Sequence, residues 1–108
     1  MANTFKLKTK ASVGITTTSV YVVPSSTTTV VIGITASNVS GNNINVGIGI
    51  TRASADDIHL MKDVPIPQGS SFEFMSGNKV VLETTDTITA KSDVASSLDV
   101  ALTIMEIT

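Results

Sequence analysis

Apolar and polar residues alternate along almost the whole chain, and no helical 3.6-residue pattern extends beyond one turn. The cleanest example spans residues 44–51, where Ile44, Val46, Ile48 and Ile50 alternate with Asn, Gly and Thr. Because successive side chains of a strand point to opposite faces, this pattern is typical of a strand with one buried face. Val, Ile and Thr make up 40 of the 108 residues, and these types favour strands as well. The pattern excludes folds that depend on helices.

Eight or nine runs of this kind follow one another, separated by turn residues at spacings of about 8–12 residues. We expect strands at 5–15, 17–23, 28–37, 44–51, 57–62, 71–75, 80–83, 87–92 and from 98 to the C-terminus. Short strands at this spacing predict an all-β fold, a two-sheet antiparallel β-sandwich of jelly-roll type, with an Ig-like sandwich as the alternative. No linker divides the chain, so residues 1–108 are expected to form a single β-sandwich domain.

The first run carries lysines on one parity, at Lys6, Lys8 and Lys10, and mostly apolar residues on the other. Simple alternation predicts a half-buried strand with Phe5 and Leu7 on its inner face and a charged outer face. The lysine row either docks onto an acidic partner surface or guards an exposed edge strand against unwanted pairing. The two interpretations are compatible.

Two later segments predict connections rather than strands. Residues 64–69 contain two prolines in three positions, which predicts a stiff extended connection. The sequence Ser-Gly-Asn-Lys at 76–79 predicts a hairpin between the strands at 71–75 and 80–83.

Charge and targeting signals exclude several classes of partner. Charged residues reach 15% against about 25% in an average soluble protein, and the net charge is −2. The resulting field is too weak to attract nucleic acid or an anionic membrane. The N-terminal residues have no signal-peptide run, and no stretch approaches the roughly 18 apolar residues of a membrane span. We therefore expect no nucleic-acid or membrane partner, and synthesis in a cytoplasm.

Catalytic and metal sites have little raw material, with one histidine and no cysteine. On a strand, Asp57 and His59 would share a face and could form a hydrolase-type dyad. No serine lies in a nucleophile-elbow context, however. Five aspartates in or near loops are candidate calcium ligands, without EF-hand spacing: Asp56, Asp57, Asp63, Asp86 and Asp93. We expect no catalytic residue, no metal and no cofactor.

Gly47 and Gly49 lie on one face of the strand at 44–51. Each glycine weakens a strand by roughly 0.5–1 kcal/mol relative to alanine, so the pair suggests a bulge or the close approach of another backbone. That backbone belongs either to the opposing sheet or to a second subunit. Together with the lysine row, the glycines are the candidate subunit-contact residues: Lys6, Lys8, Lys10, Gly47 and Gly49.

Aromatic residues are scarce, which weakens a sugar-binding role based on ring stacking. Only Tyr21 is available for stacking, because Phe5, Phe72 and Phe74 occupy alternating strand positions that fit a core.

From Val20 onward, about four fifths of the chain, the order of the segments resembles a known class of proteins. The segments are Val20–Pro24, Thr29–Gly33, Lys62–Gly69, Val81–Asp86, Ala95–Val100 and Met105–Ile107. In this order they resemble small virion structural proteins of tailed bacteriophages, most closely those of phages that infect marine cyanobacteria.

The resemblance implies a non-enzymatic virion protein, assembled in the host cytoplasm and present in many copies. A capsid decoration subunit is the first expectation, bound to other virion proteins, mainly the major capsid protein, and forming a homo-oligomer, by default a trimer. A neck or tail component and a host-receptor or glycan-binding module on the virion are the alternatives.

Overall fold

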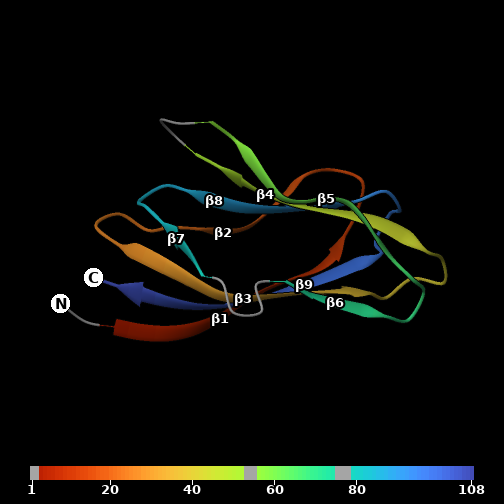
Figure 1. Cartoon of the computed structure of the whole chain (residues 1–108), viewed down its shortest axis with the longest axis horizontal. Helices are drawn as coiled ribbons and strands as arrows, with labels where there is room; N and C mark the ends of the chain where they lie inside the picture. Colours follow the sequence, from red (N-terminus) through yellow and green to blue (C-terminus); the bar gives the residue numbers. More distant parts are fainter. Residues whose placement is uncertain (1–2, 53–55, 75–78) are drawn as a thin grey trace.

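The computed structural model describes residues 3–52, 56–74 and 79–108. Within these ranges nine strands form two antiparallel sheets that face each other (Figure 1). The predicted two-sheet antiparallel β-sandwich is confirmed. The strands are β1 (Asn3–Val13), β2 (Thr18–Val22), β3 (Thr28–Asn38), β4 (Ile44–Thr51), β5 (Ile58–Ile66), β6 (Ser71–Phe74), β7 (Val80–Leu82), β8 (Thr87–Ser92) and β9 (Leu98–Ile107).

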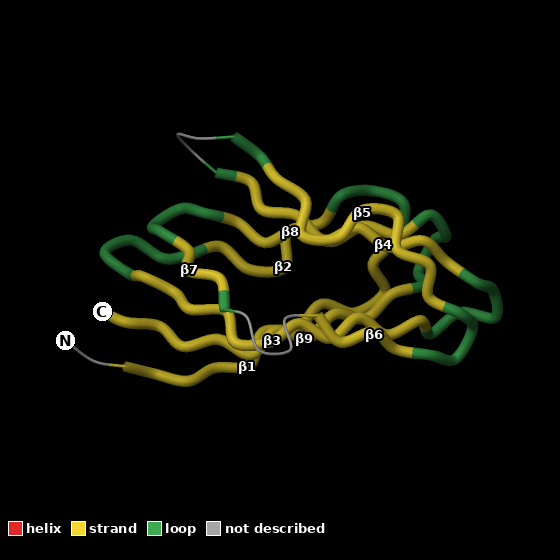
Figure 2. The backbone as a smooth tube through the Cα atoms, in the orientation of Figure 1, coloured by secondary structure: helices red, strands yellow, loops and turns green. Residues whose placement is uncertain are grey.

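The chain crosses between the sheets several times, but the consecutive strands β4 and β5 share one sheet and β6 and β7 share the other. The five-stranded sheet has the order β1-β9-β3-β6, with β7 also paired to β3, and the four-stranded sheet has the order β2-β8-β4-β5. The first and last strands lie side by side, with Asn3 opposite Ile107. Both chain ends therefore lie at the same end of the sandwich (Figures 1 and 2).

The core fills the space between the two sheets. In β4, Ile44, Val46, Ile48 and Ile50 are all buried, as their alternation predicts. Each fully buried side chain of this size contributes about 1.5–3 kcal/mol relative to an exposed one. The remaining buried apolar residues come from strands of both sheets and, at Val23, from the loop after β2: Val13, Tyr21, Val23, Val31, Ile34, Ala36, Met61, Ile66, Leu82, Ile88, Ala90, Leu98, Val100, Leu102 and Ile104.

The prediction for the first strand is wrong, because the two faces of β1 are exchanged. Lys6 and Lys8 lie opposite Ile104 and Leu102 of β9, whose side chains are buried in the core. Residues directly opposite each other in an antiparallel pair share a face, so the lysines are on the core side. Phe5 is instead on the outer face, where its side chain is exposed.

A β-bulge causes this exchange. Between Lys10 and Val13 the chain advances three residues while its partner strand advances two, from Val100 to Leu98. Ser12 takes up the extra residue at a positive φ of 56° and donates its backbone N–H to Asp99 Oδ1 at 3.0 Å. One extra residue in a strand inverts the side-chain alternation beyond it. Val13 is therefore buried even though the residues two, four and six positions before it face outward.

Two further predictions are corrected. Residues 64–66 continue β5 rather than connecting strands, and Pro65 lies opposite Asn45. Proline is tolerated there because β5 is an edge strand of its sheet. The strands β6 and β7 do not pair as a hairpin: both pair with β3, β6 at Ile34–Ser37 and β7 at Thr29–Val31. Residues 76–78 of the predicted turn lie outside the described residues.

Candidate functional site

A buried polar cluster joins β1, β2, β3 and β9 at one end of the sandwich. The Tyr21 hydroxyl donates to Glu106 Oε2 at 2.5 Å and shares a hydrogen bond of 2.8 Å with Thr29 Oγ1. Lys6 Nζ lies 2.7 Å from Glu106 Oε1, and Lys8 Nζ lies 5.9 Å from the centre of the Tyr21 ring. The inward-facing lysines thus neutralise a carboxylate that would otherwise be isolated in the core.

This cluster shifts two pKa values. Hydrogen bonds from Lys6 and Tyr21 lower the pKa of Glu106. Burial, followed by the hydrogen bond to Glu106, raises the pKa of Tyr21 to about 12. At neutral pH Glu106 is therefore held as the carboxylate and Tyr21 as the neutral phenol.

The lysine row of the sequence analysis lies on the core-facing side of β1 throughout, because Lys10 is opposite buried Val100. Lys6 and Lys8 contact residues of their own chain, and β1, which carries them, is an edge strand. Inward-pointing charges on an edge strand hinder pairing with another chain, which is the edge-guarding interpretation. The charged outer face predicted for β1 does not exist.

An apolar row crosses the outer face of the five-stranded sheet instead. Phe5, Met105, Val30 and Val81 lie opposite one another on β1, β9, β3 and β7, and Leu7 follows Phe5 on the same face. Phe5, Leu7 and Val81 are 70%, 65% and 61% exposed. Neighbouring strands are about 4.8 Å apart, so the row spans roughly 14 Å. We call these five residues the apolar row.

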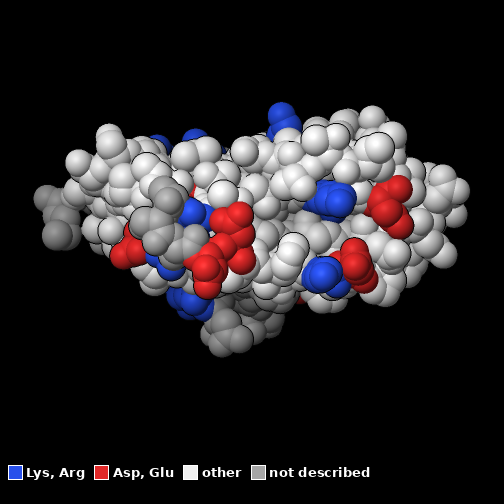
Figure 3. All heavy atoms as spheres, turned by 90° about the horizontal axis from the view of Figure 1, so that it is seen from above, with Lys and Arg blue, Asp and Glu red and all other residues white. Residues whose placement is uncertain are grey.

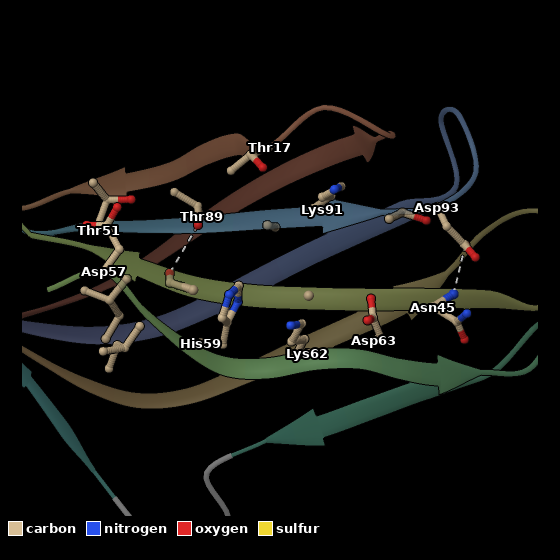
Figure 4. A pocket seen from close by; sticks show the side chains of 16 residues that line it. Thr17, Asn45, Thr51, Asp57, His59, Lys62, Asp63, Thr89, Lys91 and Asp93 are labelled. Carbon is tan, nitrogen blue, oxygen red and sulfur yellow. Dashed lines mark hydrogen bonds between the residues drawn. The ribbon is translucent and has the colours of Figure 1, made fainter.

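A polar trough occupies the outer face of the other sheet. It is a hollow of about 410 Å³ whose floor is β4 and whose walls are β5 and β8. His59, Lys62 and Asp63 reach it from β5, and Lys91 reaches it from β8 on the opposite side (Figure 4). Basic and acidic side chains lie interspersed over this face of the molecule (Figure 3).

The trough floor contains both glycines of the sequence analysis, and they differ. At Gly49 a Cβ atom would come within 2.9 Å of the Ile58 carbonyl oxygen and 3.3 Å of Thr89 Oγ1, so packing within the chain requires glycine. At Gly47 the nearest atom would be the Met61 carbonyl oxygen at 3.6 Å, an ordinary contact. Both glycines face away from the opposing sheet, which excludes that sheet as the approaching backbone.

The structure brings together the two residues of the dyad considered from the sequence, but their hydrogen bonding differs from that of a dyad. Asp57 and His59 both line the trough. Asp57 Oδ1 accepts a hydrogen bond from the Arg52 backbone N–H at 3.2 Å, and within the described residues no hydrogen bond joins Asp57 to His59. Asp57 therefore binds the local backbone, and His59 lies opposite Gly49.

The candidate calcium ligands are dispersed. In the described part of the chain, no three carboxylates or histidines lie close enough to hold a metal ion. Asp86 is buried, accepts from the Glu83 backbone N–H at 2.9 Å and pairs with Arg52 Nε at 3.3 Å. Asp93 Oδ1 accepts from the Asn45 backbone N–H at 2.9 Å. Asp86 thus closes its own turn and ties it to Arg52 after β4, and Asp93 ties its loop to β4.

Two features were not predicted from the sequence. One is the pair of trough walls, which carry Lys62 and Lys91, and the other is the exposure of the apolar row. The glycines marked the floor, but the walls follow from which strands flank β4, and strand order has no signal in a single sequence. For the apolar row, the weak strand formers Ala11 and Ser12 are the only local hint of the bulge.

Comparison with family models, curated proteins and solved structures finds no match to this chain. Among the residues that the structure describes, none belongs to a helix with the length and hydropathy of a membrane span.

Proposed function

We propose that the chain is a non-enzymatic structural subunit of a tailed-bacteriophage virion, a capsid decoration protein that docks on the head surface. The observation that carries this proposal is the apolar row on the outer face of the five-stranded sheet. Large apolar side chains that are exposed together mark a surface for protein contact. The order of segments that resembles phage virion proteins supports the same assignment.

Docking through the apolar row suits a lattice of capsid proteins. The row lies on hydrogen-bonded strands, whose backbone is already ordered, so little conformational entropy is lost on contact. In this arrangement copies of the chain bind the major capsid protein and cluster around a local symmetry axis, with a trimer as the expected assembly.

The test uses heads of the phage that encodes the chain, prepared from a strain lacking its gene. Purified chain is added and head-bound chain is measured by sedimentation. The double variant Phe5→Ser, Leu7→Ser should bind about 100-fold more weakly, because burying two large apolar side chains contributes about 3 kcal/mol.

The matched control is Ile15→Ser, Val39→Ser, which replaces two apolar side chains outside the row that are 61% and 55% exposed. The control should bind like the unchanged chain. Equal binding by both double variants would refute docking through the apolar row.

Cryo-electron microscopy of the complete particle tests the location separately. Density for the chain on the head supports decoration, whereas density only at the neck or tail replaces it by that alternative. Failure to detect the chain in purified particles by mass spectrometry would overturn the virion assignment. Light scattering of the isolated chain tests for the trimer, at three times the chain mass of 11.2 kDa.

A further inference from the structure

We infer that the trough binds a strand of a hydroxyl-rich polysaccharide of low net charge. The site comprises Gly47 in the floor, His59, Lys62 and Asp63 on one wall, and Thr89 and Lys91 on the other. This inference rests on the trough alone and does not depend on where the chain is placed on a particle.

The floor supports this inference because the chain itself leaves the space above one of its glycines, Gly47, open. Gly47 is not at a positive φ, and a Cβ atom there would meet only an ordinary contact at 3.6 Å. A glycine inside a strand costs about 0.5–1 kcal/mol relative to alanine. The open floor at this position leaves room for a molecule that approaches from outside, and the hollow of about 410 Å³ above it has the size of a ligand site.

The dimensions fit one extended polymer strand. The walls, β5 and β8, lie on either side of β4, so they are about 10 Å apart. Polar residues line the trough along the length of β4, from Thr51 near one end to Asn45 at the other (Figure 4). A chain of sugar rings can follow β4 with its apolar ring faces over the bare glycine backbone.

The wall chemistry selects sugar hydroxyls over a peptide. The backbone N–H and C=O groups of β4 pair with β5 and β8, so the floor cannot extend a sheet to a bound peptide. Lys62 and Lys91 can donate hydrogen bonds, and Asp63 can accept them. Sugar hydroxyls both donate and accept, and such side chains satisfy them without main-chain pairing.

Charge further narrows the ligand class. The trough is lined by two lysines and three aspartates, of which Asp57 and Asp93 accept hydrogen bonds from backbone N–H groups. Opposite charges in nearly equal number give no long-range attraction for a polyanion or a polycation. Binding to a neutral polysaccharide should therefore change little between low and high salt.

The trough lies on the opposite side of the sandwich from the apolar row (Figure 1). A chain docked through the row would present its trough to solvent, and an array of copies would strengthen a weak single-site affinity by roughly 100-fold or more. Tyr21, the one tyrosine, is buried, so recognition at the trough proceeds by hydrogen bonding rather than ring stacking.

The test is affinity electrophoresis of the isolated chain in gels containing dextran, mannan, galactan or a soluble β-glucan. Gels with dextran sulfate and with gelatin provide a polyanion and an extended polypeptide. We expect at least one neutral polysaccharide to retard the chain. The variant Gly47→Val, which fills the floor, should weaken that retardation about tenfold or more.

The matched control is Gly33→Val, on the outer face of the other sheet, where a Cβ atom meets nothing within 4 Å. A second pair compares Lys62→Gln, Lys91→Gln with Lys10→Gln, Lys79→Gln, which change the net charge equally. Only the trough variants should lose retardation. No retardation by any neutral polysaccharide, retention of binding by Gly47→Val, or retardation confined to dextran sulfate or gelatin would overturn the inference. None of these results bears on head binding through the apolar row.

Discussion

Tyr21→Phe removes one hydroxyl from the buried cluster and leaves the ring and its packing in place. The lost hydroxyl donates to Glu106 Oε2 at 2.5 Å and bonds Thr29 Oγ1 at 2.8 Å, and both partners are buried. A hydrogen bond to a charged group contributes about 1.5–3 kcal/mol, so we expect the free energy of unfolding to fall by about 2 kcal/mol. Urea denaturation at pH 7 should show a midpoint about 1–1.5 M lower.

A double-mutant cycle with Glu106→Gln separates the charge from the hydrogen bond. In the Glu106→Gln background the tyrosine hydroxyl contacts a neutral amide, so Tyr21→Phe should cost about 1 kcal/mol less than in the unchanged chain. A cost under about 0.5 kcal/mol for Tyr21→Phe, or an equal cost in both backgrounds, would contradict a charge-assisted hydrogen bond in this cluster.

The same cluster should make the stability of the folded chain depend on pH in acid and again in alkali. The pKa of Glu106 is lowered by folding, so its contribution to stability is present above the ordinary value of 4.5 and is lost as pH falls through the folded value. The gap between the unchanged chain and Tyr21→Phe should therefore narrow in acid. The pKa of Tyr21 is raised from 10.0 to about 12, so its contribution is complete below pH 10 and is lost between pH 10 and about 12. The phenylalanine variant should lack that alkaline component.

Two further pairs of substitutions test local features of the fold by thermal or urea unfolding. Gly47→Ala should stabilise the chain by about 0.5–1 kcal/mol. Gly49→Ala should destabilise it by about 1–3 kcal/mol, because the new Cβ atom would lie 2.9 Å from the Ile58 carbonyl oxygen. Stability changes of the same sign for both variants would contradict this distinction between the two glycines. Asn38→Ala removes donors to the Asn42 and Ile66 carbonyl oxygens and an acceptor for the Ser40 N–H, and should cost about 2–3 kcal/mol. The control is exposed Asn43, which accepts one hydrogen bond from the Gln68 backbone N–H, so Asn43→Ala should lower the free energy of unfolding by under about 1 kcal/mol. Equal losses of stability for Asn38→Ala and Asn43→Ala would refute the larger contribution assigned to Asn38.

The sequence predicted the strands and the core well where the alternation is uninterrupted. Strand β4 is the clearest case, because its apolar parity is buried throughout. The sandwich itself follows from the number and spacing of such runs. Strand order does not, because any two half-buried strands satisfy the same alternation, and only the packed structure places β5 and β8 beside β4.

The two surfaces with functional interest arise where the alternation is broken. Ser12, at φ 56°, inverts β1 and places Phe5 on the outer face. Asp63, at φ 51°, lies in β5 where three residues of that strand oppose two of β4, and neighbouring Lys62 and Asp63 both line the trough. The pattern of apolar and polar residues carries no information about φ angles. It therefore predicts an uninterrupted alternation of faces along each of these strands. A bulge costs regular pairing and re-aims side chains, which is why such irregularities concentrate near functional surfaces. On this reasoning the exposed aromatic of β1 and the charged wall of β5 both result from a β-bulge, one in each sheet.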